Sequence, residues 1–306
     1  NYTNAVWDWK SPSSKDTETL EKTARFLRQR QINTVYLDVS KGAGYTQSTG
    51  LSQSTAAKSY TDAISTYVSI MGDQGIRVYA AAGDTGWSKP DERRYPIEVM
   101  KFVYAYNKSY PKQSFQGIEF DIESYNQEGF SSASFTDKGV VLREFLEMVD
   151  QLATQHSEYI GANPASRLEL GFAIPYWYDN ENGNIRSVEW NGKTQPVAFH
   201  LMDRLNALPQ TNILVMAYRN AAAGNDGTIA HSRLEIQYAQ VKAPKVKVII
   251  GQDVTDVEPK KITFAGQTQV QLSSEVRRIY DEFGPSGVFA GIAINDLKGL
   301  IELQDN

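Results

Sequence analysis

Eight short apolar runs, rich in β-branched and aromatic residues, recur along the chain and predict β-strands. They cover residues 4–9, 33–39, 76–82, 115–122, 168–174, 212–218, 246–252 and 287–294. Between them lie segments in which apolar residues follow a helical period, among them 16–31, 136–156, 233–241 and 271–284. Strands that alternate with helices indicate βαβ units and a parallel sheet.

Eight such units predict an α/β protein that closes into a (β/α)8 TIM barrel, a fold that typically takes about 250 residues. The chain has 306 residues. We therefore expect one barrel domain over residues 1–306, with the additional length in loops. Three loops are long: 41–54, 83–96 and 176–196. Each follows a predicted strand, which places it at the C-terminal face, where barrel enzymes build their active sites.

Composition and charge exclude several classes of protein. Hydrophobic residues make up 41% and charged residues 22%, as in ordinary globular proteins. A net charge of −5 argues against a nucleic-acid partner, because a phosphate backbone would be repelled. The absence of cysteine excludes disulfides, thiolate metal sites and a cysteine nucleophile. His156, His200 and His231 have no metal-binding spacing and are expected on the surface or in helices. No metal or nucleotide cofactor is implied.

The location of the protein is only weakly indicated by the sequence. No apolar run approaches the roughly 20 residues that cross a bilayer. The chain begins at Asn1 rather than Met, which fits removal of a signal peptide and fits an artificial boundary equally. Together with the lack of cysteine, this leads us to expect a secreted, periplasmic or cell-surface protein.

The stretch "QGIEFDIES" (116–124) carries three acids at alternate positions, Glu119, Asp121 and Glu123. Side chains alternate across a strand, so these acids share one face. A half-exposed antiparallel strand would place them in water. The βα context favours a strand covered on both faces, whose acids point into the barrel while its apolar face packs on helices. Buried carboxylates must be paired or neutralised, and crowding raises the pKa of each, which keeps a general acid protonated. The apolar face consists of Ile118, Phe120 and Ile122.

This stretch resembles the signature of the chitinase-like glycoside hydrolases of family 18. That signature is an acidic residue, Gly, and then Asp-x-Asp-x-Glu on the fourth barrel strand. Gly117, Asp121 and Glu123 match it, whereas Gln116 stands at the first acid and Glu119 at the first aspartate of the triplet.

A second similarity lies in "MAYRN" (216–220), on the predicted sixth strand. The family usually has Met-x-Tyr-Asp there, so Met216 and Tyr218 match and Arg219 departs. The family often has a Trp at the end of the eighth strand, where this chain has Ile294 and Asn295. These departures put the sugar-binding subsite in question and could mean another amino sugar, another linkage or lost activity.

The resemblance implies a reaction in which the substrate's own 2-acetamido oxygen attacks the anomeric carbon, an exception to the usual two-carboxylate scheme. Glu123 would protonate the leaving oxygen and then activate water. Asp121 would orient the acetamido group and stabilise the oxazolinium ion. Glu119 would lie deeper and share a proton with Asp121, and Tyr218 would hydrogen-bond near the acetamido carbonyl.

Further candidates for substrate binding lie at or after the predicted strand ends. Aromatic faces stack on sugar C–H faces, and carboxylates or amides bind hydroxyls. The alternative is that these side chains serve core or loop packing. Asp256 and Glu258 fit loop capping, and also a second carboxylate of a two-carboxylate mechanism. The candidates are Trp9, Asp8, Asp38, Trp87, Tyr176, Tyr178, Arg219, Gln252 and Asn295.

The sequence therefore predicts a barrel glycoside hydrolase that acts on a glycan or polysaccharide with N-acetylated amino sugars through a retaining mechanism. A chitinase-like protein that binds glycans without cleaving them is one alternative. A barrel hydrolase that uses two carboxylates on a non-acetylated sugar is the other. No protein partner is implied.

Overall fold

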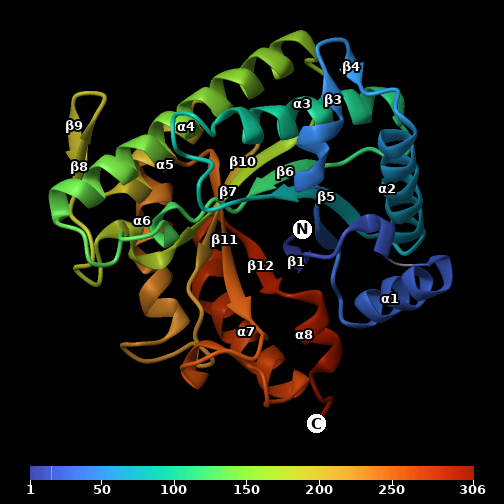
Figure 1. The fold of residues 1–306 in the computed structure, drawn as a ribbon. Coiled ribbons are helices and arrows are strands. Elements are labelled where there is room, and N and C mark those ends of the chain that lie inside the picture. Colours follow the sequence, from blue (N-terminus) through green and yellow to red (C-terminus); the bar gives the residue numbers. More distant parts are fainter. Residues whose placement is uncertain (15) are drawn as a thin grey trace.

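The computed structural model describes residues 1–14 and 16–306 and contains a closed barrel of eight parallel strands (Figure 1). Around the barrel the strands follow the order β1-β12-β11-β10-β7-β6-β5-β2. Pairing of β1 with β12 closes the cylinder, with Thr3 opposite Gly291. The barrel strands are β1 (Thr3–Asp8), β2 (Thr34–Asp38), β5 (Arg77–Ala82), β6 (Gly117–Phe120), β7 (Glu169–Pro175), β10 (Thr211–Met216), β11 (Val246–Asp253) and β12 (Phe289–Asn295).

Helices surround the strands, as Figure 1 shows. Four of them match the four segments expected to be helical, and each of the eight expected strands is present. The (β/α)8 prediction is therefore confirmed. The helices are α1 (Thr17–Gln29), α2 (Thr55–Asp73), α3 (Arg94–Ser109), α4 (Phe135–Ala162), α5 (Val197–Leu205), α6 (Thr228–Lys242), α7 (Gln269–Phe283) and α8 (Leu297–Glu302).

The two faces of each strand have different surroundings, as the alternation of side chains requires. Outward-facing residues such as Ile118 and Phe120 are fully buried in a large apolar core that they share with the helices. Inward-facing residues form a smaller cluster in the barrel, which includes Trp7, Tyr36 and Leu214. The expected packing of the acidic strand is thus confirmed, with its apolar face toward the helices.

The three long loops follow β2, β5 and β7 and lie at the C-terminal face, as expected. Two of them contain hairpins that project from the barrel in Figure 1: β3 (Thr46–Gln47) with β4 (Gly50–Leu51), and β8 (Val188–Trp190) with β9 (Lys193–Gln195). The third is shorter than expected, because α3 already begins at Arg94.

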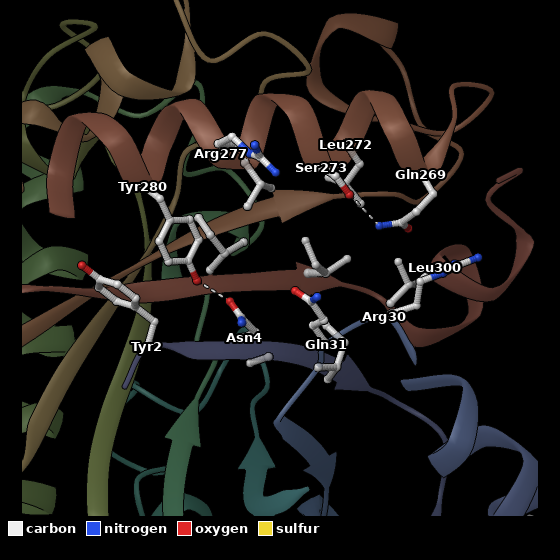
Figure 2. A pocket seen from close by; sticks show the side chains of 15 residues that line it. Tyr2, Asn4, Arg30, Gln31, Gln269, Leu272, Ser273, Arg277, Tyr280 and Leu300 are labelled. Atoms are coloured by element: carbon white, nitrogen blue, oxygen red, sulfur yellow. Dashed lines mark hydrogen bonds between the residues drawn. The ribbon is translucent and has the colours of Figure 1, made fainter. Parts of the chain in front are cut away.

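A cavity of about 470 Å³ lies on the outer wall of the barrel, away from its mouth (Figure 2). Its lining comes from β1, β12, the end of α1 and the inner side of α7, and Tyr280 of α7 donates a hydrogen bond to Asn4 of β1. The closing helix α8 has only six residues, so it covers only part of this wall. None of the helices in the described parts of the chain is apolar over a span that could cross a bilayer.

Candidate active site

A cavity of about 180 Å³ opens at the C-terminal mouth of the barrel and brings together groups from four strands. Two of the three acids of the acidic strand reach it, and two indole rings form part of its wall. A small enclosed space with aromatic walls and a few polar groups is typical of a ligand site. The lining residues are Trp7, Trp9, Asp121, Glu123, Leu214, Met216, Tyr218 and Asn295.

Asp121 and Glu123 lie just past the end of β6, which is shorter than the predicted strand 115–122. The neighbouring strand β5 ends at Ala82, whose carbonyl accepts the Asp121 backbone N–H at 2.9 Å. The chain then turns, and Asn126 donates its side-chain N–H to Glu123 Oε2 at 2.7 Å. Burial and the adjacent Glu123 carboxylate raise the pKa of Asp121 well above its usual value. Asp121 therefore holds a proton more readily than an exposed aspartate does.

Glu119 lies inside the barrel below this pair and is fully buried. Asn212 of β10 donates to its Oε2 at 3.0 Å. Gly171 of β7 leaves space for the Glu119 and Asn212 side chains. A Cβ on residue 171 would lie 2.2 Å from Glu119 Oε2 and 2.3 Å from Asn212 Oδ1. Burial, together with the charge of Glu169, raises the pKa of Glu119 well above its usual value, so the buried acid is held neutral.

Tyrosine hydroxyls surround the acids. Tyr218 lines the cavity, and burial together with the nearby Asp121 raises its pKa well above its usual value. Tyr178 is 1% exposed, and its hydroxyl has no hydrogen-bond partner among the described residues. Burial and the charge of Glu123 raise the pKa of Tyr178 as well. Both phenols therefore stay neutral donors beside the carboxylates.

Trp9 stands across the mouth, stacked on Trp7 with ring centroids 4.8 Å apart and an interplanar angle of 8°. Its indole N–H donates to Asn295 Oδ1 at 2.9 Å. Two of the predicted substrate-binding residues, Trp9 and Asn295, are thereby placed at the cavity.

Four other candidates are occupied by structural contacts. Asp8 accepts a hydrogen bond from Tyr67 at 2.8 Å, and Asp38 caps the turn at Ser40. The other two are Trp87, which is 8% exposed and stacks on Tyr95, and Gln252, which is 1% exposed and donates to backbone carbonyls at 251 and 217.

Arg219, which departs from the family's Met-x-Tyr-Asp pattern, contacts its own loop and the segment that follows β7. Its Nε donates to Asp226 Oδ1 at 3.0 Å, and its NH1 donates to the carbonyl of Tyr218 at 2.8 Å. The guanidinium also lies over the ring of Tyr176, 5.5 Å from its centroid. Arg219 and Tyr176 thus form a clamp beside the cavity, since most of the guanidinium's donors are engaged by protein.

Asp226 joins the loops that follow three strands. It contacts Arg219 and Lys261, the latter at 2.8 Å, and it lies 2.8 Å from Nε2 of His231. The other ring nitrogen of His231 lies 2.8 Å from Glu181 Oε1, in the loop after β7. Lys261 lies in the loop after β11, Asp226 in the loop after β10 and Glu181 in the loop after β7. The network therefore links three loops on one side of the barrel mouth.

The remaining acids are accounted for outside the cavity. Asp256 and Glu258 are exposed and pair with Lys260, as expected for loop residues, and neither is positioned as a second carboxylate.

Asp179 and Glu235 form a buried acid pair next to the His231 network. Burial raises the pKa of Asp179 to about 6 and, together with Asp179, raises the pKa of Glu235 well above its usual value.

The three histidines lie in helices, as expected, but they are buried rather than on the surface. His156 bonds Tyr104 and the carbonyl of Leu168, which satisfies both ring nitrogens inside the fold. In the described part of the chain, no three His, Cys, Asp or Glu side chains are arranged to hold a metal ion.

Sequence reasoning missed Asn212 and Gly171, although a signal for them was present. Residues 212, 214, 216 and 218 alternate along one strand, so Asn212 shares the inward face of Leu214, Met216 and Tyr218. A polar residue on that face, opposite a glycine on the next strand, indicated a partner for the deepest acid.

Comparisons with known proteins place the fold. No family model and no curated protein sequence matches the chain. The crystal structure of a family GH18 chitinase from Cycas revoluta in complex with allosamidin matches with a TM-score of 0.60 and 10% identity, over 99% of this chain and 96% of that one. A GH18 chitinase from Pseudoalteromonas aurantia gives 0.56 and 13%, over 99% of both chains. The catalytic domain of a beta-amylase from Paenibacillus polymyxa gives 0.54 and 10%, over 97% of this chain and 93% of that one. At these identities the likeness is one of fold: a single (β/α)8 barrel of the kind found in GH18 chitinases.

Proposed function

We propose that the protein is a glycoside hydrolase that cleaves a glycan or polysaccharide containing N-acetylated amino sugars by a retaining, substrate-assisted mechanism. The observation that carries the proposal is the meeting of Asp121, Glu123 and Tyr218 in one cavity walled by indole rings. The likeness in fold to GH18 chitinases, among them the Cycas revoluta enzyme crystallised with (GlcNAc)3 and, as a mutant, with (GlcNAc)4, supports it. A secreted, periplasmic or cell-surface location is part of this proposal.

In the proposed first step, the acetamido oxygen of the substrate attacks the anomeric carbon while the glycosidic C–O bond breaks. Glu123 gives its proton to the leaving oxygen as general acid. Asp121 accepts the acetamido N–H and faces the positive charge of the oxazolinium ion that forms. Tyr218 donates to the acetamido oxygen, for which a neutral phenol is required, and its raised pKa keeps it so.

In the second step, water attacks the anomeric carbon from the side that the leaving group vacated. Glu123, now a carboxylate, takes a proton from this water, and the oxazolinium ring opens to restore the acetamido group. The configuration at the anomeric carbon is retained, because each step inverts it. Glu119 lies deeper in the barrel. Because it is neutral, it adds no negative charge next to Asp121 when Asp121 and Glu123 are both carboxylates.

The test is hydrolysis of a panel of acetylated and non-acetylated oligosaccharides by wild type, Glu123→Gln and the matched control Glu128→Gln, an exposed acid in the same loop. We expect wild type and control to cleave acetylated substrates, and Glu123→Gln to lose about 10²- to 10⁴-fold in kcat. Binding of glycan without cleavage by all three proteins would instead establish a non-hydrolytic glycan-binding barrel.

A thiazoline analogue of the oxazolinium ion separates the two hydrolytic mechanisms. Only a site that stabilises the cyclic intermediate should bind it more tightly than substrate. Hydrolysis that the analogue does not inhibit would refute the substrate-assisted step and favour two separate carboxylates.

A further inference from the structure

The indole of Trp9 is fixed by contacts on its face and at its edge. Trp7 stacks on one face at a centroid distance of 4.8 Å, and Asn295 accepts the ring N–H at 2.9 Å. Both contacts come from residues that line the same cavity as Asp121 and Glu123. A ring held at its face and its edge cannot rotate about its side-chain torsions without breaking one of them.

The orientation of the Asn295 amide is itself determined. Its Nδ2 points at Asp253 Oδ1, 3.4 Å away. That oxygen already accepts from the backbone N–H of Thr255 at 2.9 Å and from its hydroxyl at 2.7 Å, so it is an acceptor. An amide has one donor end and one acceptor end. With the donor end facing Asp253, the acceptor end must face the indole N–H of Trp9.

We propose that Asn295 and Asp253 are positioning residues that hold Trp9 as the wall on which the reacting sugar ring stacks, a role that rests on the proposed function. Asp253 at the end of β11 fixes Asn295 at the end of β12, and Asn295 fixes Trp9 just past β1. Asn295 therefore acts through the indole instead of binding a sugar hydroxyl itself. The order of strands makes this possible, because β11, β12 and β1 are consecutive neighbours in the barrel.

The contacts from Asp253 through Asn295 to Trp9 set the position of the indole ring. An indole face binds the C–H face of a sugar without directional bonds, so the position of the ring decides where the anomeric carbon lies relative to Glu123. Misplacement by about 1 Å can cost 10²-fold in rate. Trp9 lies just past the end of β1, outside the strand pairing, so these contacts are what hold its ring in one position.

A double-mutant cycle tests the proposal. Trp9→Phe keeps a flat ring but has no N–H, and Asn295→Leu removes the acceptor at similar volume. In the wild-type background, Asn295→Leu should weaken binding of an N-acetylated oligosaccharide about tenfold, as loss of one buried hydrogen bond would (about 1.4 kcal/mol). In the Trp9→Phe background the same change should have less than a twofold effect. Equal losses in both backgrounds would overturn the proposal and place Asn295 on the sugar.

Asn295→Asp gives an independent readout if the leucine variant folds poorly. It keeps an acceptor for the indole but places a carboxylate against Asp253. The variant's affinity should fall relative to wild type as pH rises and the two carboxyl groups ionise, and a ratio of affinities that does not change with pH would overturn the proposal.

The double-mutant cycle can also be measured without ligand, through the tryptophan fluorescence emission of the free protein. Asn295→Leu should change the emission when Trp9 is present and leave it unchanged in Trp9→Phe; an equal change in both would overturn the proposal. Failure of wild type to bind any glycan would refute the proposed function, and the emission cycle would still decide whether Asn295 holds Trp9.

Discussion

Gly171→Ala tests the arrangement beneath Asp121 and Glu123, the proposed catalytic pair, more directly than any other single change. The added Cβ would lie 2.2 Å from Glu119 Oε2 and 2.3 Å from Asn212 Oδ1, whereas ordinary contacts of this kind begin at 3.4 Å. The Glu119 carboxyl and the Asn212 amide, or the backbone at residue 171, must therefore move by about 1 Å. The backbone of Gly171 has no positive φ, so alanine introduces no backbone strain, and the clash with the buried pair is the whole perturbation.

The magnitude follows from two contributions. Overpacking of a dense interior costs about 1–3 kcal/mol. Breaking the Glu119–Asn212 hydrogen bond leaves buried polar groups unsatisfied, at about 1–3 kcal/mol more. We expect a loss of about 4 kcal/mol in the free energy of unfolding, and a fall in hydrolysis because Glu119 no longer supports Asp121 from a fixed position.

Urea unfolding followed by circular dichroism measures the effect. Gly72→Ala is the matched control, because this glycine lies in α2 with open space around the new methyl group and should cost nothing. In Gly171→Ala/Asn212→Ala, the Glu119 carboxyl can move away from the new methyl group into space that the amide has left, so the double variant should lose less stability than the sum of the two single losses. Losses that simply add, or a Gly171→Ala protein within about 0.5 kcal/mol of wild type, which is the scatter of neutral surface substitutions, would refute the reasoning.

Two further changes test neighbouring groups. Tyr178→Phe removes a buried hydroxyl that lacks a partner in the part of the chain described, so unfolding by urea should show stability unchanged or raised by about 1 kcal/mol, while kcat/KM falls; a marked loss of stability would reveal an unseen partner. Glu235→Gln addresses the acid pair with Asp179, whose pKa is raised to about 6. A carboxyl whose pKa is higher in the folded chain stabilises the fold below the unfolded pKa of about 4 and loses this as pH rises through the folded value. Relative to wild type, the melting temperature of the variant should therefore rise as pH increases from about 4 through about 6. The exposed Glu21→Gln is the control, and parallel pH profiles of variant and wild type would contradict this.

The fold was predictable because buried parallel strands are near-continuous apolar runs, and eight of them recur with helices between. The acids were predictable for a related reason: Glu119, Asp121 and Glu123 keep the two-residue period of a strand, so one short segment defines their common side.

The fate of the other strand-end residues was not predictable in this way. Arg219 is held by Asp226 of its own loop and Trp87 by Tyr95 at the start of α3, through contacts set by chain paths that no strand or helix period encodes. Trp9 reaches the cavity because Asn295, 286 positions away, meets it where the barrel closes. Such partners become neighbours only through the closure of the sheet.

The position of Asp226 has a consequence for how this barrel can change. One carboxylate contacts Arg219, His231 and Lys261, and His231 in turn reaches Glu181, so segments that follow three different strands share one ionic centre. Barrels are usually regarded as modular, with each βα loop free to be exchanged. Here a loop grafted from another barrel would leave charges of its former neighbours unmatched, so these segments form a single unit of inheritance and of redesign. The loop after β2 contributes nothing to that centre among the residues described, and is the natural place to alter specificity one loop at a time.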